Sequence, residues 1–314
     1  MSDLVQVGLV GVGTIAETHL AVLAERSEVN LEFTVDPHVD QPPAFRGAEP
    51  PHYGGLSDAL EAHRPDLVVI ATPTNTHAEL TVEALTSSSA KILVEKPLVP
   101  DLSSLSRLRS LADSADVRGR VFTAHHFAFA LEVDWAVKLI AEHPEWGPVT
   151  TVTSAFYDPY APKGEQAFAS YVSSWMDSGV NQLSMLSRFV ELTGLVSGDR
   201  RMNGGASSWA TFAHRSRGTT GAARLRSSWL TGSSSKETVL AFNSSGVEVW
   251  IDHTSMTGFA VQGVSLLAAH GNDGRTPRKI AHYRPLYESL LSGDPDPVLG
   301  FDTTVTLTEL HSAP

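Results

Sequence analysis

The sequence predicts two folded parts, an α/β domain with a doubly wound parallel sheet and an α+β domain with an open, mostly antiparallel sheet. The chain has 314 residues, which is more than a single hydrophobic core usually serves. In its first third, short apolar runs alternate with helical patterns, which is typical of a parallel sheet covered on both faces. Beyond about residue 123, apolar stretches follow one another with short turns between them, as in an antiparallel sheet.

Apolar runs mark the expected strands of the first domain, and helical patterns separate most of them. The expected strands are residues 4–10, 29–35, 67–71, 91–94 and 121–124. The clearest helices are residues 15–24, 79–85 and 102–112. Residues 36–55 are rich in proline and glycine, so we expect mainly a loop there, with one weak strand. We place the boundary after residue 122, which gives domains of residues 1–122 and 123–314, and the last helix can pack back on the first domain.

The second domain is expected to begin with a helix and a strand, followed by a loop through Pro159 and Pro162. Its helices are predicted at residues 131–142, 177–193, 277–291 and 302–311. Gly194 is the expected residue after the C-cap of the second of these helices. The strands are predicted at residues 148–157, 207–214, 221–230, 238–243, 247–251 and 258–268.

Bulk composition excludes several functions. The absence of cysteine excludes disulfides, cysteine nucleophiles and thiolate metal sites, and no histidine pair has convincing metal-ligand spacing, so we assign no metal. A formal net charge of −12 argues against a nucleic-acid partner. No apolar run is long enough to span a bilayer, and the N-terminus lacks the basic region of a signal peptide, so we expect a cytoplasmic protein without a membrane partner.

A glycine turn follows the first expected strand. Residues 11–16 read G-x-G-x-x-A between a strand and a helix, which is the arrangement that binds a dinucleotide pyrophosphate. Asp36 closes the second strand about 20 positions after Ala16, where a carboxylate accepts from ribose hydroxyls; a turn residue before Pro37 is the alternative. Because this carboxylate repels a 2′-phosphate, we expect NAD rather than NADP, although NADP stays possible. The residues expected at the cofactor are Gly11, Gly13, Thr14, Ile15, Ala16 and Asp36.

A lysine ends another expected strand of the same domain. Glu95-Lys96-Pro97 follows residues 91–94, and ligands collect at the carboxyl ends of strands in a doubly wound sheet. A lysine at that edge suits a cation that hydrogen-bonds a substrate hydroxyl and exchanges its proton. The alternative is a solvated surface lysine.

Together these motifs resemble the Gfo/Idh/MocA oxidoreductase family, which includes glucose–fructose oxidoreductase and inositol dehydrogenase. The glycine motif, the run Ala71–His77 and Glu95-Lys96-Pro97 follow one another with the spacing of that family. The resemblance covers about the first 130 residues well and the second domain more loosely. It implies a Rossmann domain, a nicotinamide cofactor, and a lysine, Lys96, that contacts both nicotinamide ribose and substrate, with a bond to proline that is often cis. The further cofactor contacts expected are Thr72, Pro73, Asn75, His77 and Glu95, and for His77 a surface position is the alternative.

The family also carries an Asp-x-Gly-x-His motif whose Asp and His face the substrate. The matching stretch here runs from Asp177 to Asn181, so asparagine replaces the histidine. The two residues are four apart and share one face of a helix. Asparagine does not exchange a proton near neutral pH, so Asn181 can only orient a substrate hydroxyl, and proton transfer falls to Lys96 and Asp177. An N-cap role for Asp177 is a compatible alternative.

Within the family, an asparagine preceded by an aromatic residue resembles the galactose and L-arabinose 1-dehydrogenases, which oxidise aldoses at C1 to lactones. Those enzymes carry a histidine on the strand that enters the second domain, which His126 matches. His125 and His126 are neighbours on an expected strand, so only one of them can face the substrate. An acidic residue on the next strand is replaced by Tyr157, with Asp158 adjacent. The expected substrate contacts are His126, Tyr157, Asp158 and Trp175, and packing is the alternative role for the aromatic ones.

The sequence thus predicts an NAD-dependent dehydrogenase that moves a hydride between nicotinamide and a sugar-like alcohol carbon, with aldose C1 as the favoured position. One alternative is a dehydrogenase or ketoreductase acting at another ring carbon of a sugar or cyclitol. Another is an NAD-binding regulator without turnover, which the change to Asn181 suggests and the intact Lys96 and Asp177 argue against. The expected partners are a small sugar or cyclitol and further copies of the chain, because an open sheet leaves one face needing cover in a homodimer or homotetramer.

Overall fold

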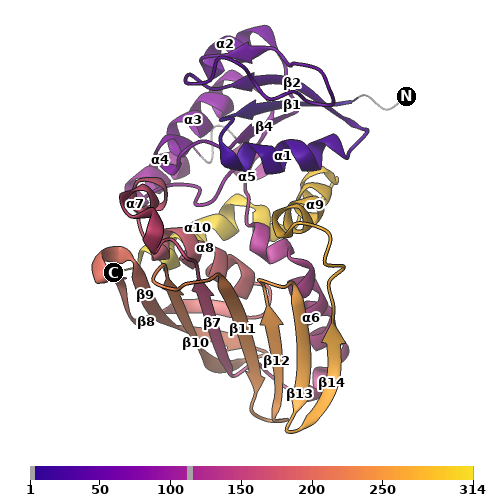
Figure 1. Cartoon of the computed structure of the whole chain (residues 1–314), viewed down its shortest axis with the longest axis vertical. Helices are drawn as coiled ribbons and strands as arrows, with labels where there is room; N and C mark the ends of the chain where they lie inside the picture. Colours follow the sequence, from indigo (N-terminus) through magenta and orange to yellow (C-terminus); the bar gives the residue numbers. More distant parts are fainter. Residues whose placement is uncertain (1–3, 112–115, 314) are drawn as a thin grey trace. The chain divides into compact units, whose positions relative to one another are not determined.

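The computed structural model describes residues 4–111 and 116–313, which fall into two compact units (Figure 1). Unit 1 comprises the described residues up to His125 together with Tyr283–Ser312, and unit 2 comprises His126–His282 with Ala313. The expected boundary after residue 122 assigned residues 283–312 to the second domain and allowed only the last helix to pack on the first, whereas the structure groups all of these residues with unit 1. The reason is burial. Tyr283 and Tyr287 are 0% exposed, and their hydroxyls contact Glu95 and His19 in the interior of unit 1.

Unit 1 contains a six-stranded parallel sheet with the order β3-β2-β1-β4-β5-β6. Its strands are β1 (Val5–Val10), β2 (Val29–Val35), β3 (His52–Tyr53), β4 (Leu67–Ile70), β5 (Lys91–Val94) and β6 (Val121–Thr123). Its helices are α1 (Thr14–Ala24), α2 (Leu56–Ala62), α3 (His77–Ser87), α4 (Leu102–Ser110), α5 (Val117–Arg120) and α10 (Phe301–Ser312), with part of α9 (Arg278–Leu291). The strand order reverses between β1 and β4, which is where doubly wound sheets bind their ligands.

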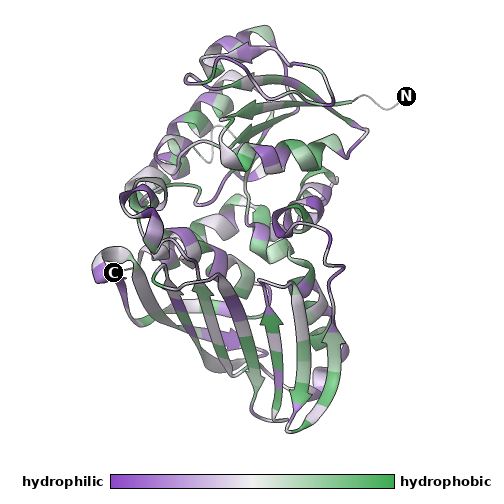
Figure 2. Ribbon diagram, in the orientation of Figure 1, coloured by the Kyte–Doolittle hydropathy of each residue, from purple (hydrophilic) through white to green (hydrophobic). Residues whose placement is uncertain are grey.

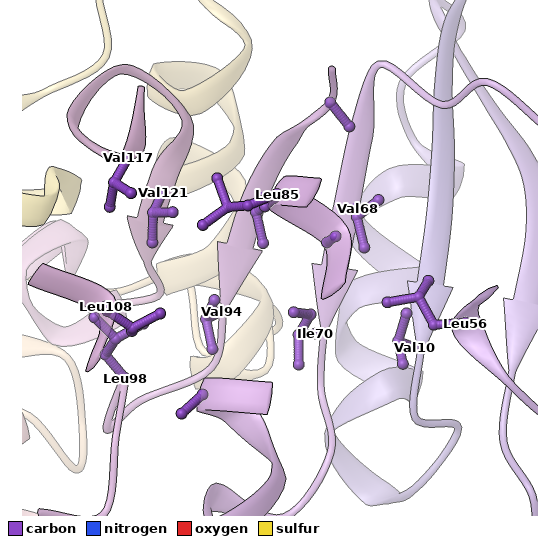
Figure 3. Close-up of a cluster of buried hydrophobic side chains, with 14 of the residues drawn as sticks. Val10, Leu56, Val68, Ile70, Leu85, Val94, Leu98, Leu108, Val117 and Val121 are labelled. Carbon is purple, nitrogen blue, oxygen red and sulfur yellow. The ribbon is translucent and has the colours of Figure 1, made fainter. Parts of the chain in front are cut away.

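The interior of unit 1 holds these strands in place. β4 is buried along its whole length, and apolar side chains of β1, β4 and β5 pack beneath the helices (Figure 3). The central strand β4, and β5 after Lys91, are therefore continuous apolar runs, whereas polar residues alternate with buried apolar ones in the first half of β2. Figure 2 colours the apolar residues of this sheet green. Because the strands are parallel and fixed by this core, the residues that follow β1, β2, β4 and β5 emerge at one edge.

Unit 2 contains an eight-stranded sheet with the order β14-β13-β12-β11-β7-β10-β9-β8, in which β7 and β10 are parallel and the other neighbours antiparallel. Its strands are β7 (Thr151–Tyr157), β8 (Glu191–Met202), β9 (Ser207–Ser216), β10 (Thr219–Ser228), β11 (Ser235–Phe242), β12 (Val247–Asp252), β13 (Thr257–Gln262) and β14 (Ser265–His270). Its helices are α6 (Leu131–Glu142), α7 (Glu165–Tyr171) and α8 (Ser174–Leu186). Burial alternates along β7, β9 and β11, so one face of the sheet is covered. The predicted fold class is confirmed.

One predicted helix is too long. The expected helix over residues 177–193 ends at Leu186, and Gly194 lies inside β8 rather than after a C-cap. Residues from Glu191 onward pair with β9 over most of its length. The backbone hydrogen bonds of this pairing hold the segment extended, which the local sequence pattern could not indicate.

Other boundaries differ as well. The expected strand over residues 258–268 is a hairpin of β13 and β14 that turns at Gly263, where φ is +59°. Helix α7 occupies part of the expected loop, and β6 ends before the two histidines, so these are not strand neighbours. The weak strand expected within residues 36–55 is β3. The expected end of a helix at residue 112 lies outside the described residues. Over residues 4–111 and 116–313, no helix has the length and apolarity needed to cross a bilayer.

Candidate active site

The glycine turn joins the end of β1 to the start of α1. Gly11 has a φ of +88°, and a Cβ there would lie 2.8 Å from main-chain atoms of Ala71, so only glycine fits. A Cβ on Gly13 would meet nothing within 4 Å, so the space beside this turn is open. None of the described side chains caps α1, which leaves its first N–H groups to an anionic ligand. The residues of this cradle, which fits a dinucleotide pyrophosphate, are Gly11, Gly13, Thr14, Ile15 and Ala16.

Asp36 directly follows β2 and contacts the glycine turn. Its Oδ2 accepts a hydrogen bond from the Val12 N–H at 3.1 Å, and its Oδ1 accepts one from the His38 N–H at 2.9 Å. A carboxylate has about four lone-pair positions, so two of them stay open to ribose hydroxyls. The turn role and the ribose role of Asp36 are therefore compatible.

His77 is buried, so the alternative of a surface position for this residue is wrong. It is 1% exposed and begins α3. Its Nδ1 lies 2.8 Å from the Pro97 carbonyl oxygen and its Nε2 lies 2.9 Å from that of Thr72. The imidazole thus joins the loop after β4, which carries the half-buried Thr72 and the exposed Pro73 and Asn75, to the loop after β5.

Glu95 is the centre of a buried hydrogen-bond network. Its Oε1 accepts from His19 Nε2 at 3.1 Å and from the Tyr283 hydroxyl, and its Oε2 accepts from the Lys96 N–H at 3.2 Å. His19 Nδ1 in turn lies 2.7 Å from the Tyr287 hydroxyl. Burial by itself raises the pKa of Glu95, but the hydrogen bonds from His19 and Tyr283 outweigh it and leave that pKa below its usual value. Both carboxylate oxygens have protein partners, so Glu95 holds the main chain of Lys96, and its contact with the cofactor stays a prediction.

Lys96 lies where the sequence places it, just beyond the carboxyl end of β5. Its side chain is half-buried, and its peptide bond to Pro97 is cis, as the family resemblance implies. Unit 1 therefore brings the expected cofactor residues and Lys96 to a single edge of the parallel sheet, at the carboxyl ends of β1, β2, β4 and β5.

In unit 2, Asp177 and Asn181 lie on α8. Ser173, not Asp177, is the N-cap, because its hydroxyl accepts from the Met176 N–H at 3.2 Å. Asp177 is in the first turn, where the helix dipole stabilises a carboxylate. Asn181 donates its amide to the Asp177 carbonyl oxygen at 3.1 Å, while its buried Oδ1 has no hydrogen-bond partner among the described residues. This unsatisfied acceptor is consistent with the predicted role of Asn181 in orienting a substrate hydroxyl.

A buried lysine of unit 2 lies near two carboxylates, those of Asp158 and Asp177. Lys236 at the start of β11 is 4% exposed and forms a buried ion pair with Asp158, just after β7. Burial lowers the pKa of Lys236, while Asp158 and, more weakly, Asp177 raise it. Burial also raises the pKa of Tyr160, and the two carboxylates add to the shift, so Tyr160 lies near both. Sequence reasoning missed Lys236, since the expected strand began at Thr238; the available signal was that Lys236 shares its strand face with Thr238.

For two expected substrate contacts, Trp175 and Tyr157, the surroundings favour other roles. Trp175 is 4% exposed, and its ring stacks at 6.3 Å on Phe212 of β9, which favours a packing role. Tyr157 belongs to the face of the sheet opposite to Ser154, whose hydroxyl bonds Gln182 of α8. Tyr157 therefore does not share the side of the sheet that carries α8 and Asp158.

The two neighbouring histidines have different partners. His125 Nε2 lies 3.1 Å from the Thr304 hydroxyl within unit 1, and burial lowers the pKa of His125 to about 4. His126 begins a short 3₁₀ turn that packs against α8, and its Nδ1 lies 3.2 Å from Nδ1 of His282. His126 is thus the one that unit 2 places beside the helix of Asp177 and Asn181.

Comparison with known proteins finds relatives of the part of unit 1 that carries the glycine turn, Asp36 and Lys96. Residues 5–125 match the profile described as "Oxidoreductase family, NAD-binding Rossmann fold", which bears out the expected NAD-binding domain. The rhizopine catabolism protein MocA of Rhizobium meliloti is 36% identical over 92 residues, which is 29% of each protein. Inositol 2-dehydrogenase of Rhizobium meliloti (strain 1021) is 30% identical over 162 residues, 50% of this chain and 47% of that enzyme. The chain thus spans less than half the length of these relatives.

The likeness to solved structures extends over both units. A dehydrogenase from Chromobacterium violaceum has a TM-score of 0.79 and covers 98% of this chain and 94% of its own, at 17% identity. At 17% sequence identity, this similarity shows a shared fold and nothing about activity.

Proposed function

We propose that this chain, whose residues 5–125 match the Gfo/Idh/MocA oxidoreductase family, is a member of that family and an NAD-dependent dehydrogenase that oxidises a sugar-like alcohol carbon. The observation that carries the proposal is the edge of the parallel sheet described above. There an open glycine turn, an acidic residue with spare lone pairs and a half-buried lysine follow neighbouring strands. The favoured reaction is oxidation of an aldose at C1 to a lactone, which rests on Asn181 in place of histidine.

Each side chain has a distinct role in this proposal. Bound NAD supplies the acceptor for the hydride. Lys96 stabilises the negative charge that develops on the substrate oxygen, and Asp177 takes the hydroxyl proton. Asn181 Oδ1 and His126 orient hydroxyls of the sugar, and Asp158 with Tyr160 contacts the ring. The cofactor is held by the cradle of α1, by Asp36, and by the loops of Thr72, Pro73, Asn75 and His77.

The test is a screen of the purified protein with NAD and NADP against aldoses, cyclitols and amino sugars, followed by the absorbance of reduced nicotinamide. We expect turnover with an aldose, a lactone product, and a lower KM for NAD than for NADP.

Asp36→Ser is expected to bring the KM for NADP closer to the KM for NAD, because the carboxylate that repels a 2′-phosphate is removed. The same absorbance assay with both cofactors measures the two KM values.

The same screen separates the alternatives. Turnover with cyclitols alone favours a dehydrogenase acting at another ring carbon, an alternative that the 30% identity to an inositol 2-dehydrogenase supports. Clear NAD binding without turnover of any of these compounds favours a regulator and overturns the proposal.

We also propose that the chain forms a homodimer or homotetramer through the open face of the unit 2 sheet. Trp209, Trp250 and Phe259 are 36–41% exposed and lie on the face opposite to α8. Trp250 and Phe259 stack at 5.9 Å and form an apolar surface that a second copy would cover. Light scattering after size exclusion is expected to give a multiple of 33.7 kDa, and Trp250→Lys a lower mass. A wild-type mass of 33.7 kDa contradicts this assembly.

A further inference from the structure

A histidine of β3 links the sheet of unit 1 to the turn that follows Asp36. His52 pairs in register with Thr34 of β2, so their side chains lie on the same face of the sheet. His52 Nδ1 lies 2.8 Å from the Thr34 hydroxyl, and His52 Nε2 lies 2.7 Å from the carbonyl oxygen of Val39. Thr34 is 0% exposed and His52 is half-buried, so the two hydrogen bonds are partly shielded from water.

The bond to Val39 fixes one proton of the imidazole. A carbonyl oxygen only accepts, so Nε2 of His52 carries the proton that it donates. A neutral imidazole then accepts from the Thr34 hydroxyl at Nδ1, whereas an imidazolium donates to the same oxygen. In either charge state both ring nitrogens of His52 have partners. The link from β3 to Val39 therefore does not depend on the charge of the ring.

The turn held in this way contributes a donor to the expected ribose contact. The Asp36 N–H donates to the Tyr53 carbonyl oxygen of β3 at 3.0 Å, which places the main chain of Asp36. The Asp36 carboxylate accepts from the N–H of His38 at 2.9 Å. Because His38 directly precedes Val39, the direction of this N–H depends on where the Val39 carbonyl is held. The orientation of the carboxylate thus depends on the turn.

The far part of the same connection has an anchor of its own. Arg46 donates to the carbonyl oxygens of Ala24 at 3.2 Å and of Val29 at 2.8 Å. Between Asp36 and this anchor, in the described part of the chain, the bond from His52 is the one hydrogen bond that joins the connection to the sheet. Loss of the imidazole therefore frees the turn while the anchor stays in place, so we expect the fold to survive.

We propose that His52 is a positioning residue of the cofactor site, which holds the turn after β2 so that the Asp36 carboxylate is oriented toward the ribose hydroxyls of NAD. The proposal rests on the ribose role proposed above for Asp36, and it adds a second determinant of the preference for NAD over NADP. The 2′-hydroxyl of NAD donates to a carboxylate, whereas the 2′-phosphate of NADP has no hydroxyl to donate at that position. A carboxylate that is held in place therefore favours NAD alone.

Isothermal titration of the purified chain with NAD and with NADP tests the proposal. In His52→Leu, the Kd for NAD is expected to rise about tenfold, while the Kd for NADP changes by less than about threefold. His52→Gln is expected to recover most of the NAD affinity, because its amide N–H can donate to Val39 and its Oε1 can accept from Thr34. A packing role alone would neither distinguish the two cofactors nor be rescued by glutamine.

A double-mutant cycle shows whether His52 acts through Asp36. Asp36→Ser is itself expected to raise the Kd for NAD. Adding His52→Leu to Asp36→Ser is expected to change that Kd by less than about twofold, because the carboxylate to be oriented is already gone. Additive effects of the two substitutions overturn the proposal, and so does an unchanged Kd for NAD in either single variant.

His63→Leu provides the matched control. His63 lies 2.8 Å from the hydroxyl of Tyr53, the other residue of β3, and its imidazole does not hold the turn. Its Kd for NAD is expected to stay within about twofold of the wild type.

If His52→Leu does not fold, Thr34→Val takes its place in the same cycle. Valine keeps the size of the side chain and removes the hydroxyl that orients the imidazole, so a rise of about threefold in the Kd for NAD is expected. An unchanged Kd overturns the proposal here as well. None of these measurements requires sugar turnover, so they decide the role of His52 even if the proposed reaction is not observed.

Discussion

Lys96→Ala is expected to lower kcat by about 10²–10⁴-fold while NAD still binds. The ammonium is the positive charge placed beyond the carboxyl end of β5, where the oxygen of the reacting alcohol gains negative charge. Nothing in the alanine variant replaces that charge, so the loss falls on kcat more than on cofactor affinity. The cradle of α1 and Asp36 do not depend on the lysine side chain.

The variant is expected to fold normally. The main chain of this residue is held by the hydrogen bond from its N–H to Glu95, and the Glu95 carboxylate is fixed by His19 and Tyr283. Stopped-flow or steady-state rates of nicotinamide reduction, together with the Kd for NAD, measure the two effects separately.

Lys91→Ala provides a matched control, because Lys91 begins the same strand at its opposite end. Its turnover is expected to stay near that of the wild type. Near-normal turnover of Lys96→Ala would contradict a catalytic role for Lys96. Asp177 would then be the remaining candidate for proton transfer.

Features encoded by a few neighbouring residues could be predicted from the sequence. The positive φ of Gly11, the open space at Gly13 and the place of Lys96 all follow from short motifs between a strand and a helix. Such motifs work because the turn geometry and the helix terminus are set within one βα unit. Strands β4 and β5 of unit 1 could be predicted for a related reason, since parallel strands buried on both faces are continuously apolar.

Features that depend on distant pairing could not be predicted in this way. Residues 187–194 follow an amphipathic helix without a strong stop signal, and only pairing with β9 makes β8 extended. The burial of Lys236 and its ion pair with Asp158 require β7 and β11 to be neighbours, although about 80 residues separate them. The contact between His126 and His282 belongs to the same class, because the two residues are distant in the chain. These contacts arise from topology, which local patterns do not contain.

Lys236→Met is expected to destabilise unit 2 by about 3–5 kcal/mol, because it leaves the Asp158 carboxylate buried without its counter-charge. Asp158 is 7% exposed, and among the described side chains its other hydrogen-bond donor is the Ser234 hydroxyl at 3.2 Å, which cannot replace a cation. Methionine has nearly the length of the lysine stem, so the volume of the site is largely kept and the loss is electrostatic. Urea denaturation of the wild type and of Lys236→Met measures this difference in the free energy of unfolding.

Tryptophan fluorescence makes this measurement specific to unit 2, because all 6 tryptophans of the chain lie within residues 126–282. The double variant Lys236→Met/Asp158→Leu is expected to recover most of the stability, since a buried ion pair exchanged for apolar side chains is often neutral in free energy. Sugar turnover is not expected to recover, because Asp158 is part of the proposed substrate site. A cost below about 1 kcal/mol for Lys236→Met would instead mean that water reaches the pair, as in a surface salt bridge. Recovery of stability without turnover would show that the pair is retained for the ligand and not for the fold.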